Sequence, residues 1–483
     1  MPATSTQTLA RTVIYAALII VTAGLTVAML LLWQNIAERK EEARQLHFRL
    51  VELTEDIVDP AEWGKNFPRQ YDGYRRTVED TRHGGSEAPP SRLEKDPLLK
   101  LIYAGHPFAV DFREARGHAY MLRDQDVSER TKRFPQPGSC LHCHSTPLQA
   151  YRQHGRQAGI GDDRPWEQLI KGFEILSTMP YERARAFVSH PVACVDCHEP
   201  RTAQLRVTRP AFLIGIRQLA RSQAPVPHLP SIAKWRQEHQ AHLQAGRPVP
   251  EYDPNMLATR QEMRSFVCAQ CHVEYYFRKP DKLLVYPWRA GLQADQIEDY
   301  YDRLDGDGFS DWTHAVTGAP LLKAQHPEFE MWSQGIHARS GVACADCHMP
   351  YRREGAIKIS DHHVRSPLRQ INVACQTCHR FPEQELEARA RSIQERTLAL
   401  VSRTEKALAE LIEALNSGKQ RGADPQTLAR ASQAHRRAHW RLDFVMSENS
   451  DGFHAPHEAL RLLAEAIDYA RQGQWAIASP STR

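Results

Sequence analysis

Five copies of one short pattern, C-x-x-C-H, contain all ten cysteines of this 483-residue chain. Two thiols three positions apart, followed at once by an imidazole, suit a haem that is joined through its vinyl groups and ligated by the histidine. A zinc site has no use for a histidine after every second cysteine. We therefore expect five covalently bound haem c groups and no disulfide. The five copies are Cys140/Cys143/His144, Cys194/Cys197/His198, Cys268/Cys271/His272, Cys344/Cys347/His348 and Cys375/Cys378/His379.

The third copy differs from the others in the residues after its histidine. The stretch CAQCHVEYYF places Glu274, Tyr275 and Tyr276 close behind the motif, and residues 323–330 read KAQHPEFE. Carboxylate, amide and carbonyl oxygens suit a hard cation such as calcium. A phenol, an imidazole and an arginine can donate hydrogen bonds and protons to a reduced oxyanion. These groups indicate chemistry beyond electron transfer.

An apolar segment near the N-terminus sets the location. Val13 to Trp33 carries no charge and is long enough to span a bilayer. We favour an uncleaved anchor over a cleaved signal segment, because a signal peptide has a shorter apolar core. Haem c is attached outside the cytoplasmic membrane, so the body is expected on the periplasmic side. The formal charge of +4 is too small to indicate nucleic acid.

The elements that must position these groups are predicted to be mainly α-helical, with few or no strands, because no clear period-2 series appears. We expect an anchor or signal segment at 1–35, a stem and a Gly- and Pro-rich loop at 36–99, a pentahaem region at 100–382 and a C-terminal helical region at 383–483. Its first helix is predicted from Glu383 to Asn416, with Gly418 ending it, and others start at Pro425 and near Pro456. The apolar stripe of the first helix packs within the subunit or forms a dimer interface. Its members are Leu386, Ile393, Leu400, Leu408, Leu411 and Leu415.

The chain resembles the ammonia-forming cytochrome c nitrite reductases over roughly residues 100–465. The similar stretches are CAQCHVEYYF, YPWRAG, SDWTHA, KAQHPEFE and GVACADCHMP, with five haem motifs in the family's order. The resemblance implies a six-electron reduction of nitrite to ammonium at a five-coordinate haem held by Cys140 and Cys143. Many members carry Lys in place of the final His of that motif, whereas this chain has His144.

The resemblance also implies the residues around the reactive haem. The catalytic residues would be Arg130, Tyr275 and His326, with Arg123 and Arg133 close to Arg130 in sequence. Calcium would be held by Glu274, Tyr275, Lys323 and Gln325. Tyr276 has no implied role, so core packing is expected.

Second axial ligands are implied for the other four haems. His118 would serve the third haem, His337 the fifth, His362 the second and His454 the fourth. His363 and His457 are the alternatives to His362 and His454.

Partners are implied by the same resemblance. They are nitrite, a membrane multihaem quinol dehydrogenase as electron donor, and a second copy of the chain in a homodimer. Two other functions stay open: a pentahaem electron carrier without catalysis, and a multihaem enzyme acting on hydroxylamine or sulfite. The carrier requires all five irons to be six-coordinate.

Overall fold

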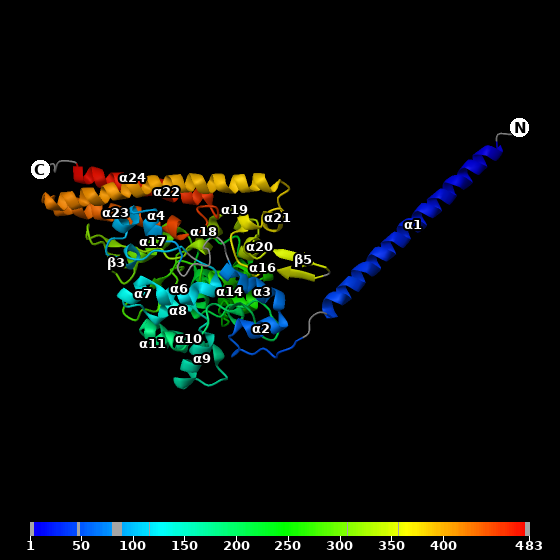
Figure 1. The fold of residues 1–483 in the computed structure, drawn as a ribbon, viewed down its shortest axis with the longest axis horizontal. Coiled ribbons are helices and arrows are strands. Elements are labelled where there is room, and N and C mark those ends of the chain that lie inside the picture. The colour runs from blue at the N-terminus through cyan, green and yellow to red at the C-terminus, as the bar shows by residue number, and fades with distance from the viewer. Residues whose placement is uncertain are drawn as a thin grey trace.

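The computed structural model describes residues 4–45, 49–79, 89–114, 116–306, 308–355 and 357–478. It is mainly helical, as predicted, and Figure 1 shows a helical body with one long N-terminal helix extending away from it. The helices before the first motif are α1 (Thr4–Gln45), α2 (Pro60–Asn66), α3 (Pro68–Arg75), α4 (Arg92–Lys95), α5 (Leu98–Ile102), α6 (Met121–Val127) and α7 (Glu129–Arg133).

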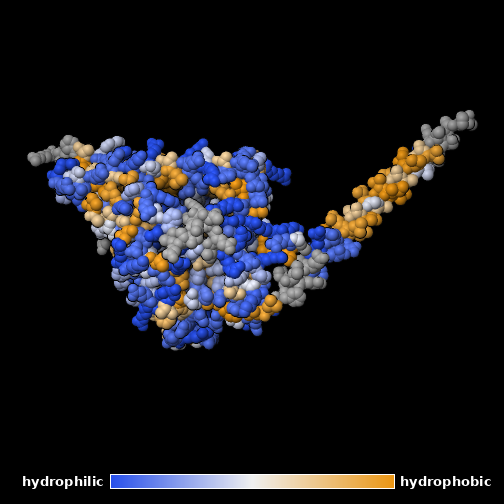
Figure 2. Space-filling view, viewed as in Figure 1, coloured by the Kyte–Doolittle hydropathy of each residue, from blue (hydrophilic) through white to orange (hydrophobic). Residues whose placement is uncertain are grey.

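Helix α1 contains the apolar segment. In the described part of the chain, one stretch, Leu9–Glu41, is long and apolar enough to cross a membrane, and none of its apolar window is buried. Figure 2 shows this apolar surface along the middle of the projecting helix and hydrophilic residues where the helix nears the body, whose visible face is dominated by polar residues. The helix continues to Gln45, so the expected anchor and the start of the expected stem form one element. The predicted Gly- and Pro-rich loop lies partly outside the described residues, and the four predicted boundaries stay predictions.

Short helices surround the haem motifs, and the few strands form three small antiparallel hairpins. The hairpins are β1 (Tyr276–Phe277) with β2 (Leu284–Val285), β3 (Trp312–Thr313) with β4 (Pro320–Leu321), and β5 (Tyr351–Glu354) with β6 (Ile357–Ser360). The helices are α8 (Leu141–His144), α9 (Leu148–Gln157), α10 (Pro165–Thr178), α11 (Tyr181–Arg185), α12 (Cys194–Cys197), α13 (Pro210–Arg221), α14 (Pro230–Gln244), α15 (Pro254–Leu257), α16 (Arg260–Ala269), α17 (Ala294–Arg303), α18 (Glu328–Gln334), α19 (Ile336–Arg339), α20 (Cys344–His348) and α21 (Ile371–Ala374).

Three long helices lie side by side along one edge of the body (Figure 1): α22 (Glu383–Gln420), α23 (Pro425–Ser447) and α24 (Pro456–Ala478). The Asp424 carboxylate caps α23 by accepting from the backbone N–H of Gln426 and Thr427, both at 3.0 Å. Leu408, Leu411 and Leu415 of the predicted stripe are fully buried within the subunit. At its C-terminal half the stripe therefore packs internally.

The expected role of Gly418 as the end of α22 is wrong. The helix continues to Gln420, and Gly418 is buried inside it. A Cβ atom at Gly418 would lie 3.1 Å from the Ile477 side chain of α24, so the glycine permits close packing of two helices. Gly422, with φ of +73°, occupies the left-handed conformation that commonly follows a helix end.

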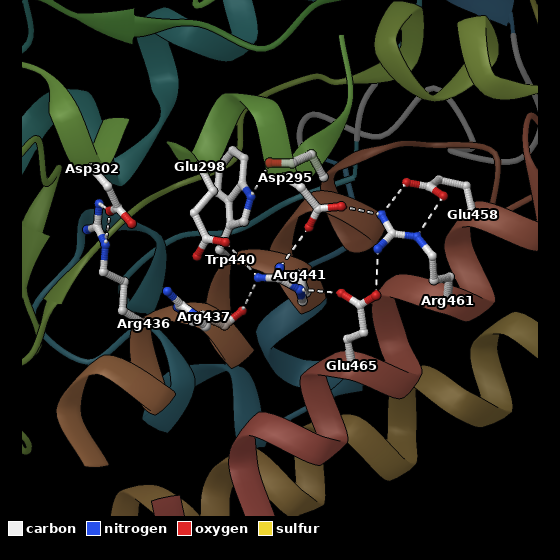
Figure 3. Close-up of polar contacts among 11 residues, drawn as sticks. Asp295, Glu298, Asp302, Arg436, Arg437, Trp440, Arg441, Glu458, Arg461 and Glu465 are labelled. Atoms are coloured by element: carbon white, nitrogen blue, oxygen red, sulfur yellow. Dashed lines mark hydrogen bonds and ion pairs between the residues drawn. The ribbon is translucent and has the colours of Figure 1, made fainter. Parts of the chain in front are cut away.

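An ion-pair network joins α17 to α23 and α24 (Figure 3). The Arg441 guanidinium donates to Glu298 at 2.8 Å, to Asp295 at 2.7 Å and to Glu465 at 2.8 Å. Arg461 donates to Asp295, Glu458 and Glu465. Because Asp295 and Glu465 each accept from both arginines, the network holds three helices in one register.

We expect Arg441→Met to lower the free energy of unfolding by about 3 kcal/mol, because it leaves the buried Glu298 carboxylate without its cation. Denaturant unfolding followed by far-UV circular dichroism measures this. Arg461→Met is the matched control: its side chain is 37% exposed, and exposed pairs contribute little. An equal loss of unfolding free energy in both variants would contradict the stabilising role of the buried Arg441–Glu298 pair.

Candidate functional site

The first motif lies in a short helical turn, with α8 ending at His144. The Nδ1 atom of His144 donates to the carbonyl oxygen of Met121 at 3.2 Å. Inside the motif, His142 is fully buried and bonds the Tyr151 hydroxyl at 3.0 Å. Because a histidine that donates from Nδ1 keeps Nε2 for a metal, His144 is oriented as a haem ligand would be.

The same orientation recurs at other motifs. His198 donates from Nδ1 to the Ala203 carbonyl at 2.8 Å, and His348 donates to the Arg365 carbonyl at 3.1 Å. The Nδ1 atom of His272 lies 3.6 Å from the carboxylate of Glu328. The third motif is placed by α16, which starts with a reciprocal cap: the Glu262 carboxylate accepts from the backbone N–H of Thr259 at 2.7 Å.

Four motif histidines face a second histidine ring across a gap that suits one iron atom. Two imidazoles bound to opposite sides of a metal ion have ring centroids roughly 6 Å apart, because each metal–nitrogen bond is about 2 Å long. The observed centroid separations are 6.3 Å for His118 and His272, 6.1 Å for His198 and His362, 6.2 Å for His348 and His454, and 6.2 Å for His337 and His379. These residues therefore fit four haem groups with two axial histidines each.

The alternatives left open by the sequence differ in geometry. His362 lies at the required distance from His198 and donates from Nδ1 to the Ser360 carbonyl at 2.9 Å. His454 faces His348, while His457 is exposed at the start of α24. These observations favour His362 as the ligand of the second haem and His454 as the ligand of the fourth.

His144 differs from these four histidines. Among the described residues, no second histidine ring lies across from it at the spacing of the four pairs. His326 and Arg130 are instead the charged neighbours that lower its pKa, after burial itself. The far side of the first haem would therefore be open.

The three residues predicted to be catalytic converge on the first motif. Arg130 and Tyr275 influence each other electrostatically and both face Cys140. The Arg130 guanidinium lies 4.2 Å from the centre of the Phe108 ring, and its Nε donates to Ser128 at 3.3 Å. Burial raises the pKa of Tyr275 well above its usual value, so this phenol stays a proton donor.

Two nearby arginines are not in this pocket. Arg123 is exposed, and Arg133 is exposed and pairs with Glu129 at 3.1 Å. Of the three arginines, Arg130 is the one that lies near Cys140, where its guanidinium packs on the Phe108 ring.

The predicted calcium ligands also lie together. One oxygen of the fully buried Glu274 carboxylate accepts from the Tyr301 hydroxyl at 2.9 Å, and the other accepts from the Gln325 backbone N–H at 2.7 Å. The Gln325 side chain lies 3.2 Å from the Lys323 carbonyl oxygen. Burial raises the pKa of Glu274 well above its usual value, and Glu330 and Asp311 raise it further. A cation here would offset this gathering of buried carboxylates, so the oxygens fit calcium.

Side chains beyond the predicted ligands support this arrangement. The ammonium group of Lys323 donates to Asp443 at 2.9 Å and to Ser447 at 2.9 Å, whereas its carbonyl oxygen accepts from Nε2 of Gln325 at 3.2 Å. Tyr276 bonds Tyr300 at 2.8 Å and is buried among aromatic rings, which fits its expected packing role. The sequence reasoning missed Tyr301, Asp443 and Asn449, which carry no local signal. Glu328 and Glu330 stand in the quoted stretch KAQHPEFE but received no role.

We expect Glu274→Gln to weaken calcium binding by roughly a hundredfold, at the upper end of what loss of a supporting group costs a metal site. The neutral amide removes the charge that a hard cation requires. Calcium content after dialysis against a chelator measures the effect. Glu298→Gln, a buried carboxylate in the ion network, is the control. Equal calcium retention in the two variants would contradict the site.

The motifs are arranged in space in an order that the chain does not follow. The Cys143 and Cys271 thiols lie against each other, as do Cys268 and Cys344. Cys347 lies near both thiols of the fifth motif, and Cys197 near Cys271. The third motif is therefore the centre, with the first, second and fourth around it and the fifth beyond the fourth.

Cys378 of the fifth motif is an exception to the expected burial of the haem-binding thiols. It is exposed, whereas the other nine cysteines are buried or partly buried, and the adjacent His379 is exposed as well. The physical reason is position: this motif lies at the outer end of the series, just before α22, where little of the chain covers it. Attachment of a haem to Cys378 therefore stays a prediction, supported by the motif and by the His337–His379 spacing and not by burial.

Comparisons with known proteins agree with this geometry. The model of the family described as Cytochrome c552 matches residues 59–483. The cytochrome c-552 of Bacteroides fragilis is 34% identical over 453 residues, which cover 92% of this chain and 81% of that protein. The cytochrome c-552 of Aliarcobacter butzleri is 32% identical over 458 residues, 92% of this chain and 80% of that protein. Among solved structures, the catalytic subunit of the cytochrome c nitrite reductase from Desulfovibrio desulfuricans matches with a TM-score of 0.70 and 26% identity, covering 89% of this chain and 87% of that chain. It is described with two calcium sites.

Proposed function

Because this chain belongs to the cytochrome c552 family, we propose that it is an ammonia-forming nitrite reductase. Nitrite would receive six electrons and eight protons to give ammonium and two molecules of water. The observation that carries the proposal is the difference at His144. It is the motif histidine with a pocket of Arg130, Tyr275 and His326 instead of a second imidazole at haem-ligand distance. The similarity to the Desulfovibrio desulfuricans nitrite reductase supports it.

The residues of the pocket have different roles in binding nitrite and in supplying protons. The haem joined to Cys140 and Cys143 would supply the site at which the nitrite nitrogen binds and the route by which electrons reach it. Arg130 offers charge-assisted hydrogen bonds to the oxygens of the anion. His326 holds a proton for the leaving oxygens. Tyr275, kept protonated by burial, donates a hydrogen bond at the same place.

The other four motifs would carry electrons. Their paired histidines leave no position for substrate, and the electrostatic neighbours of their thiols indicate a series from the fifth motif through the fourth and third to the first. We propose a membrane multihaem quinol dehydrogenase as the donor, with α1 keeping the chain at the periplasmic face of the same membrane. The proposed assembly is a homodimer through the long C-terminal helices.

Ammonium formation tests the proposed function. Purified holoprotein is supplied with nitrite and a reduced viologen dye, and we expect one ammonium per nitrite and one high-spin haem signal. Absence of ammonium together with five low-spin irons would show an electron carrier instead. Assays with hydroxylamine and sulfite separate the other multihaem activities.

We expect Tyr275→Phe to keep all five haems and to lower kcat for nitrite roughly a hundredfold, because one positioned donor is lost from the pocket. Steady-state ammonium production measures the change. Tyr276→Phe is the matched control, since its hydroxyl bonds Tyr300 in the core. Unchanged turnover in Tyr275→Phe would remove this phenol from the reaction.

A further inference from the structure

Glu328 lies between two histidines that belong to different parts of the proposed machinery. Its Oε1 atom is 3.6 Å from Nδ1 of His272, a ligand of the third haem, and 3.8 Å from Nδ1 of His326, the proton donor of the pocket. The two imidazole rings are 6.4 Å apart and nearly perpendicular. One buried carboxylate therefore reaches both.

The carboxylate is anchored from the opposite side. Asn449, just beyond α23, donates from Nδ2 to Oε1 of Glu328 at 2.6 Å, and Arg92 donates to the Asn449 side-chain oxygen at 3.3 Å. The Oε2 atom of Glu328 and the Nδ1 atom of His326 are both buried without a hydrogen-bond partner. The two histidine distances are slightly longer than a hydrogen bond, so the carboxylate acts on both imidazoles at once through its charge.

We propose that Glu328 is a positioning residue shared between the third haem's ligand and His326, so that one carboxylate orients both the electron path and the proton donor. The inference rests on the proposed function. A carboxylate on Nδ1–H makes an axial histidine a stronger donor and lowers the reduction potential of its haem. The same carboxylate favours a proton on Nδ1 of His326, so that the protonated imidazole directs its Nε2–H towards substrate.

No other haem ligand described in this structure shares its polar partner with His326. His144, His198 and His348 donate from Nδ1 to neutral backbone carbonyls. His454 of the fourth haem also has a carboxylate, Glu448, at 2.5 Å from Nδ1, but its ring faces His348. Glu448 is therefore the matched comparison: a carboxylate on a haem ligand without the second contact to the pocket.

The test combines potentials with a double-mutant cycle on the holoprotein. Glu328→Gln keeps the size of the side chain and removes its charge. We expect one low-spin haem to shift to a higher reduction potential, its electron paramagnetic resonance signal to change, and kcat to fall roughly tenfold with KM little altered. In a His326→Ala background, Glu328→Gln should cause no further loss of kcat while the shift in potential persists. Glu448→Gln should shift a different haem and should remain additive with His326→Ala.

The outcomes separate the inference from the proposed function. An unchanged potential, or a loss of kcat that adds fully to that of His326→Ala, would overturn the shared role. If the wild type forms no ammonium, the proposed function fails, and the potentials and spectra still test the contact with His272. Haem content checks folding. Should Glu328→Gln lose haem, Asn449→Ala frees the carboxylate from its anchor, and a change in the potential of the same haem together with the dependence on His326 is required.

Discussion

His326→Ala lowers kcat for nitrite by roughly a hundredfold to ten-thousandfold, the range that a positioned proton donor contributes. The proposed reaction consumes eight protons per nitrite, and His326 is a neighbour of His144 that, after burial, helps to lower its pKa. Its Nδ1 atom lies 3.8 Å from the Glu328 carboxylate, which leaves Nε2 for the pocket. Ammonium production at saturating nitrite measures kcat, and haem content shows that the fold is kept.

His154→Ala is the control for loss of a buried imidazole. This histidine bonds the Ala150 carbonyl of its own helix at 2.8 Å and packs against Phe187. We expect its turnover to stay close to that of the wild type. If His326→Ala were as active as His154→Ala, proton supply would have to come from another group, and Tyr275 would be the next candidate.

Arg130→Leu reduces kcat/KM for nitrite by roughly a thousandfold, because removing one partner of a buried charged hydrogen bond costs about 4 kcal/mol. The guanidinium is a half-buried cation near Cys140, and a leucine there removes this counter-charge for the entering anion. The loss should appear in KM as well as kcat, since Arg130 contacts the substrate before the reaction starts. Initial rates over a range of nitrite concentrations separate the two.

Arg133→Leu and Arg123→Leu are matched controls from the same short region. Both arginines are exposed, and Arg133 pairs with Glu129 in solvent. We expect each to change kcat/KM by less than about twofold, since exposed ion pairs contribute little. A large loss in either control with normal kinetics in Arg130→Leu would move the anion contact to the other arginine.

Local features of the chain were predictable because their determinants are adjacent in sequence. The five attachment motifs, the apolar N-terminal segment and the long C-terminal helices each depend on residues within one turn or one helix. The mainly α-helical fold with few strands was predicted correctly for the same reason. The one wrong prediction there, Gly418 as a helix end, came from reading a contact between α22 and α24 as a local signal.

The pocket residues were assigned from the family resemblance. The tertiary structure shows the contacts that favour each assignment. Three arginines stand close together in sequence, and only burial against Phe108 distinguishes Arg130. The predicted calcium ligands come from two segments, and the Glu274 carboxylate meets the Gln325 backbone only when these segments fold together. Composition and spacing contain no information about either contact.

The sequence by itself therefore determined where the haem motifs stand, that the chain carries a membrane-length apolar helix, and which helices are long. Only the tertiary structure decided how the histidine pairs implied by the resemblance are placed, with His118 6.3 Å from His272 and His337 6.2 Å from His379. It also decided that the third motif lies at the centre, that Cys378 is exposed at the outer end, and that Glu328 reaches two imidazoles at once. The physical reason is distance along the chain: a covalent motif and a helix are specified by neighbouring residues, whereas these contacts form only when packing brings remote segments together.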